Sequence, residues 1–191
     1  MIESKLKIGV SGDAGSFSEE AGKLYMDRES LNAELVYSID MEGVLASLER
    51  GEINLGIFPV VNSQGGLVHQ AFVAMGRHNF TLKDELWLEV QQCLLVLPGL
   101  THKEIKNIAT HPQAVLQCQR YIKREFPDAK IIEWADTAKA ARDLKAGLLP
   151  AATAVIAPAR AAGLYGLEIL ERNIQDMRPN LTTFIVCTNY E

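Results

Sequence analysis

The segment Leu-Gly-Ile-Phe-Pro-Val, residues 55–60, is a continuous apolar run that predicts a buried β-strand. Just before it, residues 41–50 carry apolar side chains at helical spacing, and Gly51 follows them as a typical helix stop. Just after it, residues 61–66 become polar and glycine-rich, as expected of a loop. A helix that leads into a buried strand, which then ends in a polar loop, indicates an α/β fold.

The same alternation extends over the whole chain. The other strands are expected at residues 7–10, 34–38, 87–97, 107–110, 130–133, 153–156, 168–171 and 183–188. The other helices are expected at residues 17–26, 112–126, 137–146 and 158–165, with a helix or an irregular connector over 67–75. Residues 76–83 are polar and poorly periodic, which marks a crossing between lobes. The prediction is a two-lobed α/β protein with mixed, largely parallel sheets.

Composition and charge exclude several classes of protein. The chain has 191 residues, of which 48% are hydrophobic and 23% are charged, as is ordinary for a globular protein. The net charge of −5 and the scattered Lys and Arg residues argue against a nucleic-acid partner. The chain shows neither an apolar signal segment nor an apolar stretch of membrane-spanning length. A cytoplasmic location without a membrane partner is therefore expected.

The cysteines and histidines do not form a metal-binding pattern. Cys93, Cys118 and Cys187 lie far apart in apolar surroundings, which is typical of buried thiols in a reducing compartment. None of the four histidines is paired with another at i, i+4 spacing. No metal site is therefore predicted.

Small polar residues follow four of the predicted strands. Open α/β sheets bind ligands beyond the carboxyl ends of their strands, and helix N-termini at those ends favour anions. The four loops are residues 11–18, 59–66, 110–113 and 136–138. At any single position the alternative is structural, since Ser16, Ser18, Thr110 and Asp136 are also ordinary helix caps. Taken together, the loops predict a cleft that binds a small anion.

His111 directly precedes a proline at an expected helix start. A helix N-terminus disfavours a positive charge, so a neutral, hydrogen-bonding imidazole is predicted there. The alternative is a histidine that only packs the loop.

Several short motifs occur in an order that resembles one known family. Residues 12–21 are similar to an opening loop Gly-Pro-x-Gly-Thr-Phe-Ser, and residues 59–68 to a Pro-Ile-Glu-Asn-Ser segment. Residues 110–118 resemble a Ser-His-Pro-Gln-Ala block, and residues 180–184 a closing Asn-x-Thr-Arg-Phe signature. Further similar segments are residues 137–141, 165–167 and 173–176. In this order the motifs resemble the catalytic domain of prephenate dehydratase over nearly the whole chain.

This resemblance implies a fold like that of type II periplasmic binding proteins, with lobe 1 at residues 1–75 and 166–191 and lobe 2 at residues 76–165. It implies a homodimer that binds the small molecule prephenate in the cleft between lobes. Such enzymes convert prephenate to phenylpyruvate in phenylalanine biosynthesis, with loss of carbon dioxide and water and without a metal or organic cofactor. Many also carry a regulatory ACT domain. Since the chain ends soon after its last motif, that module is expected to be absent.

The resemblance also implies roles for individual residues. Thr182 aligns with the catalytic threonine and is the expected donor of a proton or a strong hydrogen bond to the departing hydroxyl. The residues expected to bind the substrate are Ser11, Ser16, Asn62, Ser63, Gly66, Thr110, His111, Gln113, Thr137, Ala138, Thr183 and Phe184.

Three positions differ from the family pattern. Thr183 stands in place of an arginine, Val61 in place of a glutamate, and Gln92 in place of a common histidine. Arginine is well suited to hold a carboxylate, so its replacement leaves two interpretations. Either the arginine and the glutamate were charge partners whose joint loss is compensated, or they were separate catalytic groups.

Three functions are compatible with these residues. The first is a prephenate dehydratase with an altered cleft, for which arogenate is an alternative substrate. The second is a decarboxylase that keeps the hydroxyl of prephenate, and the presence of Thr182 argues against it. The third is a non-catalytic protein that binds prephenate or a related aromatic acid.

Overall fold

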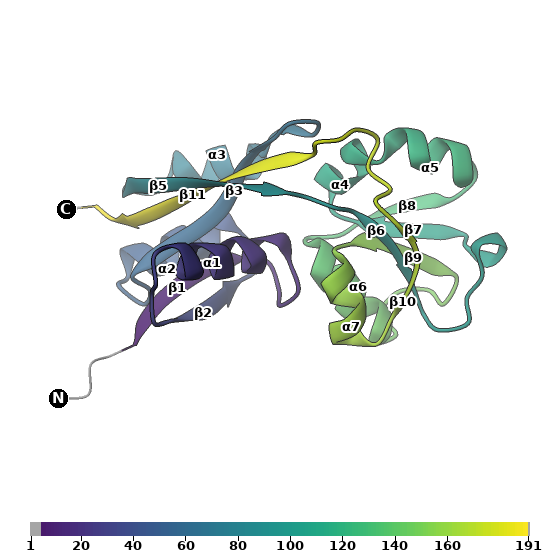
Figure 1. Ribbon diagram of the computed structural model, residues 1–191, viewed down its shortest axis with the longest axis horizontal. Helices are drawn as coiled ribbons and strands as arrows, with labels where there is room; N and C mark the ends of the chain where they lie inside the picture. Colours follow the sequence, from purple (N-terminus) through teal and green to yellow (C-terminus); the bar gives the residue numbers. More distant parts are fainter. Residues whose placement is uncertain (1–4, 191) are drawn as a thin grey trace. The chain divides into compact units, whose positions relative to one another are not determined.

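The computed structural model describes residues 5–190, and the chain forms two compact units (Figure 1). Unit 1 comprises residues 5–13, 17–88 and 181–190. Unit 2 comprises Ala14–Ser16 and Glu89–Asn180. Each unit has its own sheet and its own hydrophobic core.

The main crossings between the units lie later in the chain than the expected lobe boundaries at residues 75 and 165. They fall after Leu88 and after Asn180. The reason is strand pairing, because β5 (Phe80–Glu89) pairs within the sheet of unit 1 and β10 (Glu168–Arg172) pairs within the sheet of unit 2.

The sheet of unit 1 has the strand order β2-β1-β3-β11-β5, and the short β4 pairs with β3 beside this row. The strands are β1 (Leu6–Ser11), β2 (Ala33–Ser38), β3 (Leu55–Asn62), β4 (Gly66–Leu67), β5 and β11 (Leu181–Asn189). Strand β1 runs parallel to β2 and β3, whereas β11 runs antiparallel to β3. The apolar run at residues 55–60 therefore lies inside the sheet, as its composition predicts.

Helices cover both faces of this sheet (Figure 1). Helix α1 (Phe17–Arg28) shares one core cluster with Phe184. Helices α2 (Met41–Glu49) and α3 (His69–Met75) share the opposite cluster with Ile185, because successive strand residues alternate between faces. Gly56 permits the close approach of α2, since a Cβ atom there would lie 2.8 Å from a methyl group of Val44.

The sheet of unit 2 has the strand order β10-β6-β9-β7-β8. Besides β10, the strands are β6 (Cys93–Val96), β7 (Asn107–Thr110), β8 (Lys130–Glu133) and β9 (Thr153–Ala157). Strand β7 is parallel to β8 and β9, while β6 is antiparallel to β9 and β10. The sheet of unit 2 is therefore mixed, like that of unit 1.

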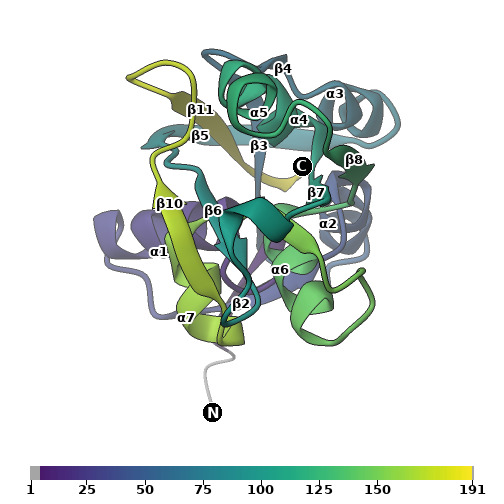
Figure 2. The ribbon, with the colours of Figure 1, turned by 90° about the vertical axis from the view of Figure 1, so that its right-hand side faces the viewer.

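Helices lie on both faces of the second sheet as well (Figure 2). Helices α6 (Thr137–Lys145) and α7 (Ala159–Tyr165) pack on one face, and α4 (Pro112–Gln117) and α5 (Gln119–Glu125) pack on the other. A short 3-10 turn, His102–Glu104, precedes β7.

Two elements that the sequence predicts as continuous are divided in the structure. The strand expected at residues 87–97 is split into β5 and β6, because the N–H of Val90 donates to Asn180 and that of Gln92 to the side chain of Gln175. The helix expected at residues 112–126 is split into α4 and α5 at Cys118, whose φ of −123° is not helical.

The three cysteines are buried, unpaired thiols, as predicted. Burial raises the pKa of Cys93, and it raises the pKa of Cys187 to about 12. These thiols therefore stay protonated and act as small apolar groups. Within residues 5–190, no helix combines the length and the apolar character that a membrane crossing requires.

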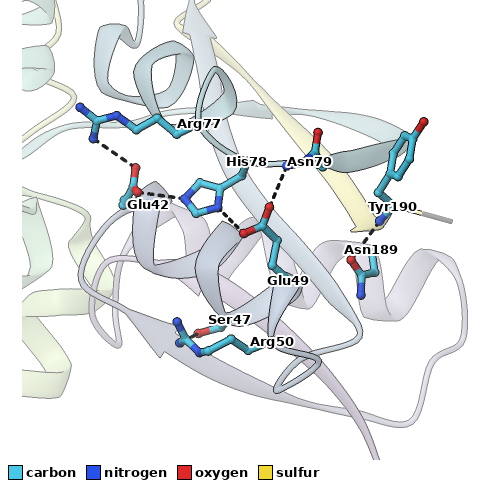
Figure 3. A network of polar contacts seen from close by, with 9 residues as sticks. All are labelled: Glu42, Ser47, Glu49, Arg50, Arg77, His78, Asn79, Asn189 and Tyr190. Carbon is cyan, nitrogen blue, oxygen red and sulfur yellow. Dashed lines mark hydrogen bonds and ion pairs between the residues drawn. The ribbon is translucent and has the colours of Figure 1, made fainter.

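His78 links helix α2 to the segment before β5 through two carboxylates (Figure 3). Its Nδ1 lies 2.8 Å from Oε2 of Glu49, and its Nε2 lies 2.9 Å from Oε1 of Glu42. Arg77 approaches the other oxygen of Glu42 at 3.6 Å, and the N–H of Asn79 donates to Glu49. Both ring nitrogens must carry protons for both bonds to form, and the bond to Glu49 is the main cause that raises the pKa of His78.

Replacement of His78 should therefore destabilise the protein in a pH-dependent way. The folded pKa of His78 lies above the ordinary 6.5, so its contribution is complete below that value and is lost as the pH rises through the folded pKa. The bonds from Asn79 and His78 lower the pKa of Glu49, so its contribution is complete above the ordinary 4.5 and is lost at lower pH. Both contributions are complete between the ordinary values of 4.5 and 6.5. We expect His78→Gln to lower the free energy of unfolding most in this pH range.

Chemical denaturation at several pH values measures this difference. His69→Gln replaces an exposed histidine on α3; it is the matched control and should show only a small difference. The interpretation is wrong if His78→Gln costs as much at about pH 9 as at about pH 5.5.

Candidate active site

The pairing of β3 with β11 sets Asn62 and Thr182 directly opposite each other. The Nδ2 of Asn62 donates to Oγ1 of Thr182 over 2.9 Å. Both side chains are almost fully buried, with 3% and 6% of their surfaces exposed. The predicted proton donor and a predicted substrate-binding residue thus form one buried pair in unit 1.

The orientation of the Asn62 amide is determined by its other contacts. Its Oδ1 accepts from the N–H groups of Gln64, at 2.9 Å, and Gly65, at 2.7 Å. The NH₂ group must therefore face Thr182, whose oxygen acts as the acceptor. Among residues 5–190, the Thr182 hydroxyl accepts this bond and donates none, so its proton remains available to a ligand.

Ser63 and Gly66 lie in the hairpin that follows β3. Ser63 accepts from the N–H of Leu181 through Oγ, at 3.0 Å, and its own N–H donates to the carbonyl of Leu181, at 2.8 Å. Gly66 pairs with Asn62 and has a φ of 70°, which favours glycine. These contacts attach the start of β11, and so Thr182, to the hairpin.

Thr183 points away from the Asn62–Thr182 pair, and Phe184 points into the core. Phe184 is buried in the cluster beneath α1, so its side chain supports the sheet. Thr183 lies on the opposite face from Phe184 and is the register partner of Val61, which packs against the α2 and α3 cluster. The two positions where the family pattern has arginine and glutamate are therefore cross-strand neighbours.

The loop after β1 contributes to both units. Ser11 lies within 3.1 Å of Ser18 on α1, and both are buried in unit 1. Ser16 belongs to unit 2, where Tyr165 of α7 donates to the carbonyl of Ala14. Arg160 of the same helix donates to the carbonyl of Gly15.

In unit 2, Thr110 and His111 occupy the carboxyl end of β7. Thr110 is fully buried, and its hydroxyl donates to the carbonyl of Ile156 on β9, over 2.7 Å. His111 caps α4, because its Nδ1 accepts from the N–H of Gln113 at 3.2 Å. This bond requires an unprotonated Nδ1, and burial lowers the pKa of His111. The predicted neutral histidine is confirmed, with its proton on Nε2.

Thr137 and Ala138 begin helix α6, which Asp136 caps by accepting from the N–H of Lys139 at 2.8 Å. Because β7 and β8 are parallel, the loops that lead into α4 and α6 lie at the same edge of this sheet. The structure thus brings His111, Gln113 and the α6 start to one edge of unit 2. Ser11, Asn62 and Thr182 belong to unit 1.

Sequence reasoning missed Gln117 and Asn180 as interacting residues. Both are buried, and Oε1 of Gln117 accepts from the side-chain amides of Asn180, at 2.8 Å, and Gln92, at 3.0 Å. Both residues lie in segments that resemble family motifs, residues 110–118 and 180–184, but those motifs do not show which groups they bind. Within residues 5–190, no three His, Cys, Asp or Glu side chains are close enough to hold a metal ion.

Solved structures identify the class of fold. The prephenate dehydratase of Arthrobacter aurescens, in complex with L-Phe, aligns with a TM-score of 0.81 and 25% identity, over 97% of this chain and 61% of that chain. A periplasmic substrate-binding protein of an ABC transporter from Coxiella burnetii aligns with a TM-score of 0.53 and 15% identity, over 95% of this chain and 83% of that chain. The α/β fold of the periplasmic-binding-protein type is therefore confirmed.

The family follows from the sequence as a whole. The family model of prephenate dehydratase matches residues 8–191, so this chain belongs to the prephenate dehydratase family. Chloroplastic arogenate dehydratase 5 of Arabidopsis thaliana is 35% identical over 184 residues, which cover 96% of this chain and 42% of that protein. The chain spans less than half the length of the curated relatives that it matches.

The protonation state of His111 is open to direct measurement. Its ¹⁵N shifts at neutral pH should show a protonated Nε2 and an unprotonated Nδ1, because Nδ1 accepts from the backbone. Its titration midpoint should lie below the ordinary 6.5, since burial disfavours the charged ring. A midpoint above that value, or a proton on Nδ1, would show that the cap is wrongly interpreted.

Proposed function

We propose that this protein is a prephenate dehydratase, which removes carbon dioxide and water from prephenate or from its amino-acid counterpart arogenate. Membership of the family supports the reaction class. The observation that carries the proposal is the Thr182 hydroxyl, whose oxygen accepts from Asn62 and which therefore keeps its own proton for another acceptor. The two substrates are both considered because one relative is named for arogenate and one solved neighbour for prephenate.

The reaction breaks two bonds on opposite sides of a ring. The bond from the ring to its carboxylate breaks, carbon dioxide leaves, and the electron pair enters the ring. The bond from the opposite ring carbon to its hydroxyl oxygen breaks at the same time. The departing hydroxide takes up a proton and leaves as water. The gain of an aromatic ring favours these changes, so the protein mainly has to orient the substrate and assist the leaving oxygen.

Thr182 and Asn62 suit the second of these tasks. The Thr182 hydroxyl donates a hydrogen bond to the departing oxygen, and negative charge develops on Oγ1 as its proton moves to form water. Oγ1 regains a proton from solvent water as the products leave. The N–H of Asn62 already points at that oxygen and stabilises the charge, without any rearrangement. A buried amide is effective here because little water competes with it.

The substrate carboxylates would be held mainly by backbone N–H groups at strand ends. The hydroxyl of Thr110 already donates its proton to the carbonyl of Ile156, so it cannot also donate to a carboxylate. Backbone N–H groups of the loop are therefore the proposed donors at this position. His111 adds a neutral Nε2–H donor. The other proposed binding residues are Ser11, Ser16, Ser63, Gly66, Gln113, Thr137 and Ala138.

The replacements at Val61 and Thr183 fit the interpretation of joint compensation. The two residues are register partners, so a glutamate and an arginine in these places would be close enough to pair. A β-branched pair occupies the same positions without leaving an unpaired buried charge. We therefore propose that the double replacement leaves the Thr182 chemistry intact.

The proposal includes a cytoplasmic homodimer that acts in phenylalanine biosynthesis. The three unpaired thiols are compatible with a reducing compartment. The dimer rests on the family resemblance alone.

Turnover of prephenate and arogenate tests the function. The wild-type protein should form phenylpyruvate from prephenate or phenylalanine from arogenate, as identified by mass spectrometry. Thr182→Val keeps the shape of the side chain but removes its donor, so the rate should fall about 10²-fold or more. Thr182→Ser retains the hydroxyl and serves as the matched control. Binding of either compound without product would show a non-catalytic homologue, and a non-aromatic product would show a decarboxylase.

Asn62→Asp tests the direction of the hydrogen bond. The new carboxylate can still accept from Gln64 and Gly65, but it would accept the Thr182 proton as well. The rate should fall at least about tenfold, and the thermal midpoint should fall too, because the variant buries a charge and loses the bond from Nδ2 to the carbonyl of Leu181. Asn54→Asp is the matched control, because Oδ1 of Asn54 only accepts from the N–H of Lys7 on the same sheet. Equal rates for both variants would refute the assigned role of Asn62.

A further inference from the structure

We propose that Gln117 is a positioning residue that fixes the start of strand β11 and, through it, the Thr182 hydroxyl. The inference rests on the proposed function for its catalytic consequence. Its structural part can be tested without any activity.

The side chain of Gln117 joins two distant segments within unit 2. Its Oε1 accepts from Nδ2 of Asn180 at 2.8 Å and from Nε2 of Gln92 at 3.0 Å. Asn180 also donates to the carbonyl of Val90 at 3.1 Å, and the N–H of Val90 donates to the carbonyl of Asn180 at 2.7 Å. These are the segments at which the chain enters and leaves the main part of unit 2.

The direction of every bond in this network follows from one backbone carbonyl. The carbonyl of Val90 can only accept, so Asn180 must present its NH₂ group. Gln117 must then present its oxygen to Asn180, and Gln92 must present its NH₂ group to the same oxygen. The three amides therefore have one arrangement, which is the property required of a positioning element.

Gln117 is itself held in place from its backbone. Its carbonyl accepts from the N–H of Asp176 at 2.8 Å. The carboxylate of Asp176 accepts from the N–H groups of Arg120, at 2.8 Å, and Tyr121, at 3.1 Å, at the start of α5. The acceptor that receives Asn180 is thus anchored to the helices and not only to other side chains.

The network reaches the proposed catalytic group over a very short stretch of chain. Asn180 is fully buried and lies two residues before Thr182. Loss of the Gln117 oxygen would remove the acceptor that Asn180 and Gln92 share, which forces a local rearrangement of these buried amides. Such a shift at Asn180 displaces the peptide that leads into Thr182, and a displacement of this kind strongly reduces the rate of an oriented reaction.

Two substitutions at Gln117 separate the acceptor from the volume of the side chain. Gln117→Met keeps the length but removes the acceptor. Gln117→Glu keeps an oxygen for both donors, and among residues 5–190 no acceptor for Nε2 of Gln117 is present, so this variant loses no hydrogen bond. Gln92→Met removes only one of the two bonds and should show a weaker effect of the same sign.

Amide hydrogen exchange gives the readout that does not depend on activity. In Gln117→Met, exchange at Leu181 and Thr182 should be about tenfold faster, while Val186 on the same strand stays unchanged. Gln117→Glu should resemble the wild type. Unchanged exchange at Leu181 and Thr182 in Gln117→Met would overturn the proposal, whatever the substrate proves to be. If Gln117→Met does not fold, the same comparison is made with Gln92→Met.

Kinetics then test whether Gln117 acts through Thr182. With the substrate that the wild type turns over, Gln117→Met should lower kcat about tenfold with little change in KM, and Gln117→Glu should restore it. In a Thr182→Val background, Gln117→Met should have no further effect on kcat. Equal losses in both backgrounds would show a general structural role. An inactive wild type refutes the proposed function and leaves hydrogen exchange to decide the positioning.

Discussion

The antiparallel pairing of β3 with β11 is the constraint on which the candidate active site depends. It joins Asn62 to Thr182 across 120 positions of sequence. The register shifts by one residue beside Pro59, which has no N–H to give to the ladder, so Val60 has no partner on β11. Without this extra residue Thr182 would lie opposite Val61, and its oxygen would lack the amide donor. The bulge therefore decides which side chains meet.

The polar groups around this pairing are directed by backbone atoms and not by charges. Two N–H groups in the loop after β3 orient the Asn62 amide, and one carbonyl at Val90 orients the amides that hold Asn180. In each of these two networks the donors and acceptors can be arranged in only one way, because a backbone N–H only donates and a carbonyl only accepts. Buried neutral groups hold this geometry without the desolvation penalty of an ion pair. A site that lacks the arginine of its family can be well ordered for this reason.

The sequence predicts those parts of the protein that depend on local patterns. The buried strand at residues 55–60 and the neutral His111 follow from apolar runs and from a helix start, and both agree with the structure. The crossings between the units were placed too early, because the pairing of β5 and β10 depends on partners far away in sequence. The hydrogen bonds of Gln117 to Asn180 and Gln92 were not predicted either, because these partners are also far away in sequence. Roles taken from family motifs could be assigned to residues, but not their hydrogen-bond directions.

The two histidines with altered pKa values show how one residue type meets opposite requirements. His78 lies between two carboxylates and is stabilised as the charged ring, whereas His111 accepts a backbone N–H and is stabilised as the neutral ring. The pKa of His78 is raised and that of His111 is lowered from the same ordinary value of 6.5. As the pH rises, the α2 contact weakens, and as it falls, the α4 cap is lost. Between the two pKa values, each histidine is in the form that its contacts require, and the ordinary value of 6.5 lies inside that range.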